Sequence, residues 1–138
     1  MIYRLYIETK PQPQNTAWAF SVFNHQDFRI YKLTGLCEHT DEKAAILETA
    51  VRALTYFSNF IRRRYYDEHF ATILDEDNIT LFSHLPDIEK AASVFPNDDG
   101  KYMRYWTQMR PFLERDTMFF QTTPQGDVLS ESTLKLIK

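Results

Sequence analysis

The sequence has 138 residues, the length of one domain with a substantial hydrophobic core. Hydrophobic residues make up 43% of it and aromatic residues 15%, which is typical of globular rather than disordered chains. The formal net charge of −3 gives no overall attraction to nucleic acid, so binding of that kind would need a local basic surface.

The chain shows no sequence signal for a membrane or for export. No apolar run approaches the roughly 20 residues that span a bilayer, and the first residues lack the apolar stretch of a signal peptide. Cys37 is the single cysteine, so an internal disulfide is impossible and a reducing compartment fits. We therefore expect one domain over residues 1–138, in the cytoplasm and without a membrane segment.

The first third of the chain has the pattern of three consecutive strands. Alternating apolar positions predict strands at Ile2–Thr9, Ala17–Phe23 and Phe28–Gly35. The segment "KPQPQNT" separates the first two, and its prolines cannot donate to a sheet. "NHQD" fits a hairpin turn before the third strand.

The hydrophobic period then changes to that of a helix. In "HTDEKAAILETAVRALTYFSNFIRRRYY" apolar residues recur every three or four positions, which predicts one long amphipathic helix. Thr40 or Asp41 can cap its beginning. Three consecutive arginines near its end complement the helix dipole.

The rest of the chain alternates between strands and helices. Strands are predicted at Ile79–Ser83 and Thr117–Thr123, and helices at "PDIEKAASVF", "KYMRYWTQMRPFLER" and "VLSESTLKLIK". Pro111 should kink or divide the second of these helices, in which Trp106 and Met109 have core spacing. The element order βββ-α-β-α-α-β-α predicts the α/β class, with a mixed sheet and helices on both faces.

This order of elements, with the long first helix in particular, resembles the ribonuclease H-like family. The resemblance implies a five-stranded sheet in which the first three strands form an antiparallel meander and the last two run parallel to the first. Enzymes of this family use about four carboxylates to hold two divalent metal ions, Mg²⁺ or Mn²⁺, which cleave a phosphodiester.

Two of the four family carboxylates have counterparts by position. The family's first aspartate ends the first strand in a "TDGS"-like motif, where "YIETK" offers Glu8 without the glycine. The second is a glutamate in the first turns of the long helix, where Glu42 fits and Glu48 is the later choice. Under the resemblance, Glu8 and Glu42 are the candidate metal ligands.

The other two carboxylates are replaced. The family aspartate that ends the fourth strand corresponds to His84 in "LFSHLPD", with Asp87 three residues beyond. In the last helix Ser132 lies nearest to the expected aspartate, and Asp127 and Glu131 are the local acids. The family's "GHxG" loop before that helix is also absent, with "TTPQG" in its place.

We therefore predict a non-catalytic interaction module that needs no cofactor. The alternative is a divergent two-metal nuclease that uses Mg²⁺ or Mn²⁺. Its catalytic residues would come from the set Glu8, Glu42, Glu48, His84, Asp87 and Glu131.

Two segments that mix basic and aromatic residues are candidate binding surfaces, because guanidinium groups bridge phosphates and tyrosines stack on bases. The candidate contact residues are Arg62, Arg63, Arg64, Tyr65, Lys101, Arg104 and Tyr105. The competing interpretation is a solvated helix end for the first segment and core packing for the second. The partner is a protein or structured nucleic acid, and self-association stays open.

Overall fold

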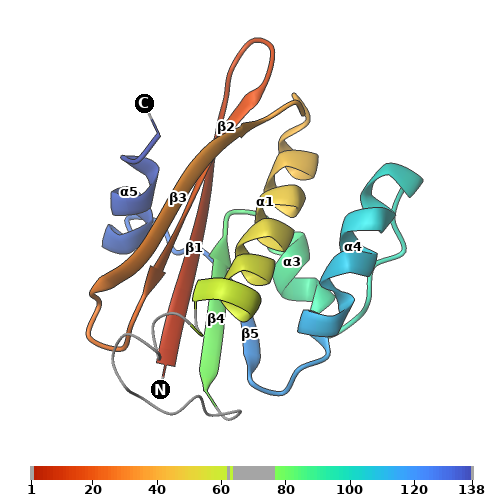
Figure 1. Cartoon of the computed structure of the whole chain (residues 1–138). Helices are drawn as coiled ribbons and strands as arrows, with labels where there is room; N and C mark the ends of the chain where they lie inside the picture. The colour runs from red at the N-terminus through yellow and green to blue at the C-terminus, as the bar shows by residue number, and fades with distance from the viewer. Residues whose placement is uncertain (1, 62, 64–76, 138) are drawn as a thin grey trace.

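A computed structural model describes residues 2–61, 63 and 77–137 of the chain. Its centre is a mixed sheet with the strand order β3-β2-β1-β4-β5 (Figure 1). Strands β1 (Ile2–Pro11), β2 (Thr16–Phe23) and β3 (Arg29–Cys37) form an antiparallel meander. Strands β4 (Asn78–Ser83) and β5 (Met118–Thr122) continue the sheet beside β1 and run parallel to it. The predicted fold class is confirmed.

Helices cover both faces of this sheet (Figure 1). One face carries α1 (Glu42–Tyr56), α3 (Pro86–Ala91) and α4 (Gly100–Leu113), and a short π-helical segment, η1 (Phe57–Ile61), continues α1. The other face carries α5 (Val128–Leu134). No helix in the described ranges is long and apolar enough to cross a membrane.

Successive side chains of β1 point to opposite faces of the sheet, and this alternation determines which of them face which helices. Tyr3, Leu5 and Ile7 are buried in the main core, which also contains residues of α1 and α4. Tyr6 points to the opposite face, where its ring stacks on that of Phe82 with centroids 4.4 Å apart. Glu8 has the same parity as Tyr6, so it lies on the face that α5 covers.

The helices confirm some of the expectations and correct others, since α3 ends at Ala91 and α1 at Tyr56, both earlier than predicted. Asp41 caps α1, because its Oδ1 atom accepts a 3.0 Å hydrogen bond from the backbone of Lys43. Trp106 and Met109 are fully buried, as their spacing predicted. Pro111 does not divide α4, since only two helical residues follow it and just the last turn loses a hydrogen bond. The last helix ends at Leu134, earlier than the predicted Lys138.

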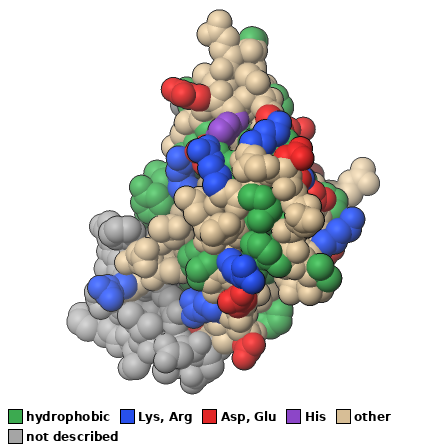
Figure 2. Space-filling model, turned by 90° about the vertical axis from the view of Figure 1, so that its right-hand side faces the viewer, with side chains coloured by type: hydrophobic (Ala, Val, Ile, Leu, Met, Phe, Trp, Pro, Cys, Tyr) green, Lys and Arg blue, Asp and Glu red, His purple; other side chains and the backbone are tan. Residues whose placement is uncertain are grey.

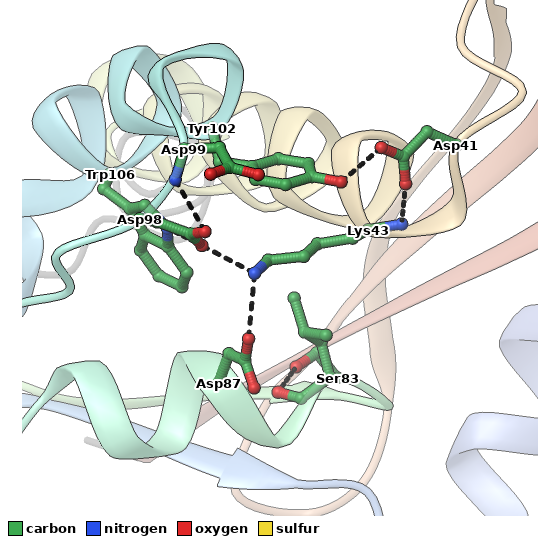
Figure 3. Close-up of polar contacts among 9 residues, drawn as sticks. Asp41, Lys43, Ser83, Asp87, Asp98, Asp99, Tyr102 and Trp106 are labelled. Atoms are coloured by element: carbon green, nitrogen blue, oxygen red, sulfur yellow. Dashed lines mark hydrogen bonds and ion pairs between the residues drawn. The ribbon is translucent and has the colours of Figure 1, made fainter.

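Charged side chains of both signs are interspersed on the side of the molecule where α4 lies (Figure 2). Several of them join α4 and the segment before it to the beginning of α1 (Figure 3). The Asp41 carboxylate accepts a hydrogen bond from the Tyr102 hydroxyl and lies 3.2 Å from Nζ of Lys101. This hydrogen bond from Tyr102, more than any other interaction, lowers the pKa of Asp41.

Lys43 makes a second connection between the same elements. Its Nζ atom lies 2.6 Å from Oδ2 of Asp98 and 3.1 Å from Oδ2 of Asp87 (Figure 3). Burial alone would lower the pKa of Lys43, but the hydrogen bonds from its ammonium to the two carboxylates raise it above the ordinary value. The same contact lowers the pKa of Asp98. Lys43 therefore holds α3 and the segment before α4 against α1.

The Lys43 contact predicts how acid affects folding. A carboxyl whose pKa is lowered in the native state stabilises the fold above its unfolded pKa of about 3.9, and this contribution disappears as the pH falls through the native value. We expect Lys43→Met to lower the free energy of unfolding at pH 7, because Asp98 and Asp87 lose their cation. The deficit should shrink below pH of about 4.

Urea unfolding at pH 7 and near pH 2.5 measures this difference, with Lys90→Met as the control because Lys90 is exposed on the neighbouring helix. A Lys43→Met deficit of the same size at both pH values would contradict the assignment.

Candidate functional site

Glu8 is a buried carboxylate near the end of β1. Its side chain is only 4% exposed. A charged group in such a place must be hydrogen-bonded or paired, because water no longer solvates it. The partners of the Glu8 carboxylate therefore decide whether it can bind a metal ion.

Two side chains satisfy the Glu8 carboxylate. The Nε2 atom of His84 lies 2.8 Å from Oε2 and 3.0 Å from Oε1 of Glu8. The Ser130 hydroxyl donates a hydrogen bond to Oε1 and lies 3.5 Å from Nε2 of His84. We refer to Glu8, His84 and Ser130 as the Glu8 cluster.

The fold brings these three residues together from distant parts of the chain. In the parallel pair of β1 and β4, Tyr6 lies beside Phe82, so the residues two positions later, Glu8 and His84, also lie side by side. Ser130 comes from the first turn of α5, which Asp127 caps by accepting from the backbone of Leu129 and Ser130. That turn places the Ser130 side chain over the end of β1.

The order of hydrogen bonds differs from that of a hydrolytic triad. In a triad the imidazole lies between the serine and the acid, so that it can take the hydroxyl proton. Here the carboxylate of Glu8 lies between Ser130 and His84 and accepts from both. The arrangement stabilises a buried anion and does not present an activated serine. His84, which is half-exposed, forms the outer side of the Glu8 cluster.

The candidate carboxylates from α1 and α3 do not join Glu8. Glu42 is exposed in the first turn of α1. Glu48 faces His39, with 3.7 Å between its Oε1 and the imidazole Nε2, and Asp87 is paired with Lys43. The sequence could not decide which side of each helix these acids occupy.

In α5 the structure corrects the expected serine. Ser130, rather than Ser132, contacts Glu8, whereas Ser132 accepts a 2.5 Å hydrogen bond from Nη2 of Arg29. Glu131 is exposed. The sequence reasoning missed Ser130, although its place three residues after a capping aspartate puts it in the first turn, which faces the sheet.

Asp127 is also occupied by contacts within the fold. Besides capping α5, its Oδ2 atom accepts a 3.0 Å hydrogen bond from the Tyr6 hydroxyl. Burial, and secondarily this hydrogen bond, raises the pKa of Tyr6 well above its usual range. Asp127 therefore serves the packing of α5 on the sheet.

The residues present do not fit a two-metal centre. Such a centre needs several acidic oxygens that converge within a few ångströms. Within the ranges that the structure describes, no group of three or more His, Cys, Asp or Glu side chains is placed to hold a metal ion. The Glu8 cluster supplies one carboxylate, one imidazole and one hydroxyl.

The candidate binding residues on α4 are engaged within the fold. The Arg104 guanidinium lies 4.6 Å from the centroid of the Tyr105 ring and donates to its hydroxyl. Tyr105 is buried, and its hydroxyl lies 2.7 Å from Nε2 of His39, so its ring is not available to stack on a base. Lys101 remains exposed beside Asp41.

The candidate residues at the end of the long helix are only partly covered by the structure. Arg63 is exposed. Arg62, Arg64 and Tyr65 lie outside the described residues.

Comparison with known proteins identifies the architecture. No protein-family model and no curated protein matches the sequence. Among solved structures, RNase H1 from the halophilic archaeon Halobacterium salinarum NRC-1 superposes with a TM-score of 0.73 at 13% identity, covering 99% of this chain and 95% of the other. LC11-RNase H1, isolated from compost by a metagenomic approach, gives 0.73 at 11% identity, covering 98% and 91%.

A viral structure shares the fold as part of a longer chain. The foamy viral protease-reverse transcriptase in complex with RNA/DNA hybrid has a TM-score of 0.64 at 10% identity, with 97% of this chain matching 18% of the viral one. These likenesses agree with the strand order and with the parallel β1-β4-β5 half of the sheet. The chain therefore has the ribonuclease H-like fold.

Proposed function

We propose that this chain is a non-catalytic ribonuclease H-like module that binds structured nucleic acid. The observation that carries the proposal is the Glu8 cluster. Glu8 is its only carboxylate, and that carboxylate already accepts from His84 and Ser130. Hydrogen bonds thus stabilise the Glu8 carboxylate, whereas a nuclease needs carboxylate oxygens that are free to bind metal ions.

Charge balance explains why this cluster is a poor site for two metal ions. Two Mg²⁺ ions bring four positive charges, which the surrounding carboxylates must offset. Mg²⁺ also prefers oxygen ligands in an octahedral arrangement, and the imidazole of His84 is not one of them. A metal ion at Glu8 would compete for carboxylate oxygens that already accept hydrogen bonds from His84 and Ser130.

The proposed partner rests on the fold and on the sequence. LC11-RNase H1 and the foamy viral protein have both been solved in complex with RNA/DNA hybrid. The run Arg62–Arg64 supplies three adjacent guanidinium groups that can pair with phosphates. A protein partner is the competing class, and it predicts no salt-dependent binding of a duplex.

A divergent two-metal nuclease is the alternative function. The retained acid at the end of β1 favours it, because Glu8 lies where the resemblance places the first metal ligand. In that case Glu42 or Glu48 would have to approach Glu8 on metal binding. The two functions differ in an assay of cleavage and in the response to metal ions.

We expect the purified protein to leave labelled RNA/DNA hybrid, duplex RNA and duplex DNA intact in Mg²⁺ and in Mn²⁺. The reason is that one carboxylate does not hold the ions that activate water. Gel analysis should show the same uncut substrate for the wild type and for Glu8→Gln, with an active RNase H1 as the positive control. Cleavage by the wild type that Glu8→Gln abolishes would establish the nuclease instead.

Restoring carboxylates should restore metal binding. In the double variant His84→Asp/Ser130→Asp, three carboxylates would meet at the end of β1. At Mg²⁺ concentrations ten times the Kd, binding adds about 1.4 kcal/mol, or roughly 4–6 °C in Tm for a domain of this size. Thermal unfolding with and without Mg²⁺ should show this rise in the double variant and no rise in the wild type.

The matched control is His84→Asn/Ser130→Asn, which has nearly the same side-chain volumes but adds no charge. Its Tm, like that of the wild type, should not rise when Mg²⁺ is added. A wild-type Tm that rises with Mg²⁺ as much as that of the aspartate variant would show that the natural site already holds the ion.

Duplex binding should be electrostatic and should depend on the arginine run. We expect a mobility shift of RNA/DNA hybrid that weakens as salt rises. Replacing Arg62–Arg64 by alanine should reduce the slope of log K against log salt by up to about 2.7, or about 0.9 for each phosphate contact.

Lys32→Ala/Lys90→Ala/Lys135→Ala removes the same charge from exposed positions elsewhere and is the control. Equal losses in both triple variants would indicate an effect of net charge alone. The absence of any shift by the wild type would favour a protein partner.

A further inference from the structure

The sheet has β5 at one outer edge and β3 at the other, and the two edges differ in how their backbone groups are satisfied. In β5, Thr123 bonds to β4, so alternation turns Met118 and Thr122 outward. The N–H of Met118 donates to the carbonyl of Arg115 over 3.1 Å, and that of Thr122 donates to Oε1 of Glu89 over 3.3 Å. An edge strand whose outward groups are occupied in this way offers little to a further strand.

The β3 edge is longer and less covered. This strand has nine residues, against five in β5, and it forms the outer border of the meander (Figure 1). The helices α1 and α5 pack on β1 and β2 rather than on β3. Within the residues that the structure describes, no backbone hydrogen bond caps the outer side of β3.

The hydrogen-bond pattern of the meander shows which groups of β3 point outward. Gln12 donates to the carbonyl of Asn15, so these residues form a bonded pair across the β1–β2 turn. Bonded and non-bonded pairs alternate along an antiparallel ladder, so every second residue of β2 from Thr16 onward turns to β3. Their partners on β3 are Cys37, Gly35, Leu33 and Tyr31. The N–H and C=O groups that point away from the sheet are therefore those of Lys32, Thr34 and Leu36.

We propose that β3 pairs with β3 of a second copy of this chain, antiparallel and around a two-fold axis. Such a contact joins the two sheets into one continuous sheet. The axis passes beside Thr34, so that Thr34 forms a bonded pair with its own counterpart, and Lys32 forms one with Leu36 of the second copy. The proposal is independent of nucleic-acid binding.

Charge complementarity selects this register. If Lys32 instead faced Thr34 of the second copy, the two Lys32 side chains would be diagonal neighbours at about 7–8 Å and would repel each other. With Thr34 on the axis they are separated by four residues along the strand, or about 13 Å. The diagonal neighbour of Lys32 is then Glu38 of the second copy, which is exposed just after the end of β3. A shift in the other direction would leave fewer residues of β3 paired.

Shape complementarity favours a second copy over an arbitrary extended peptide. In the same register the half-buried Leu33 faces Gly35 of the second copy, where no side chain competes for space. A Cβ atom on Gly35 would lie only 2.4 Å from Cζ2 of Trp18, so the indole covers this glycine closely. On the other face, Leu36 is 63% exposed, and the apolar stem of Lys32 from the second copy would cover it.

A disulfide at Thr34→Cys tests the register. The Cα atoms of a bonded antiparallel pair are about 5.5 Å apart, a distance that a disulfide can bridge. Under mild oxidation we expect Thr34→Cys to form a covalent dimer on a non-reducing gel. Lys32→Cys is the matched control, because it is exposed on the same strand but lies beyond the bridging limit of about 7 Å from its counterpart. The natural Cys37 is buried and should not cross-link in the wild type.

Sedimentation equilibrium of the full chain at rising protein concentration measures the association itself. The wild type should pass from monomer to dimer. Thr34→Pro removes an outward N–H, as an edge strand can tolerate, and should stay monomeric. Thr34→Val keeps that N–H and should dimerise like the wild type. Circular dichroism shows whether Thr34→Pro retains the fold.

Exchange of charges provides a test that does not need the proline variant. Lys32→Glu should raise the Kd of the dimer about fivefold, because it brings like charges together at Glu38. The double variant Lys32→Glu/Glu38→Lys restores the attraction and should return the Kd to that of the wild type.

Any one of four results would overturn the proposal. They are a wild type that is monomeric at every concentration, equal cross-linking of Thr34→Cys and Lys32→Cys, a folded Thr34→Pro that still dimerises, and a charge exchange that does not restore the affinity.

Discussion

The buried carboxylate of Glu8 constrains the whole α5 side of the molecule. Removing a charged carboxylate from water is costly unless hydrogen bonds replace the lost solvation, and here His84 and Ser130 provide them. His84 follows β4 and Ser130 belongs to α5. Their hydrogen bonds to Glu8 therefore hold the end of β4 and the first turn of α5 against β1. A metal ion at Glu8 would compete with these hydrogen bonds for the carboxylate oxygens.

The opposite face of the sheet is organised by a different kind of charge pairing. Lys43 and Asp41, at the beginning of α1, hold the segments around α4 through partly exposed contacts. Water screens such contacts, so each stabilises the fold less than the burial of Trp106 and Met109 in the core does. Their main effect is geometric. Through Asp87 and Asp98, the contacts of Lys43 fix α3 and the segment 92–99 relative to the beginning of α1.

The sequence predicted the architecture because the hydrophobic period of each segment indicates its secondary structure, and the order of the elements limits the sheets that they can form. The resemblance to the ribonuclease H-like family placed Glu8 and His84 at the ends of the first and fourth strands. They lie side by side because adjacent parallel strands end at the same edge of a sheet. The sequence prediction failed for residues whose position depends on the rotation of a helix. Each side chain on an α-helix points about 100° around the axis from the one before it. This rotation brings Ser130, rather than Ser132, to Glu8 and turns Glu48 toward His39. Tyr105 was open to two interpretations for the same reason, and tertiary packing buries it.

The central claim is that hydrogen bonds to Glu8 occupy the place that metal ions fill in the enzymes of this fold. The most direct measurement is a crystal structure of the protein grown in Mn²⁺, with anomalous scattering to locate the ions. The account predicts no manganese at Glu8 and a carboxylate still bound by His84 and Ser130. Two manganese ions beside Glu8, with Glu42 or Glu48 turned toward them, would contradict it.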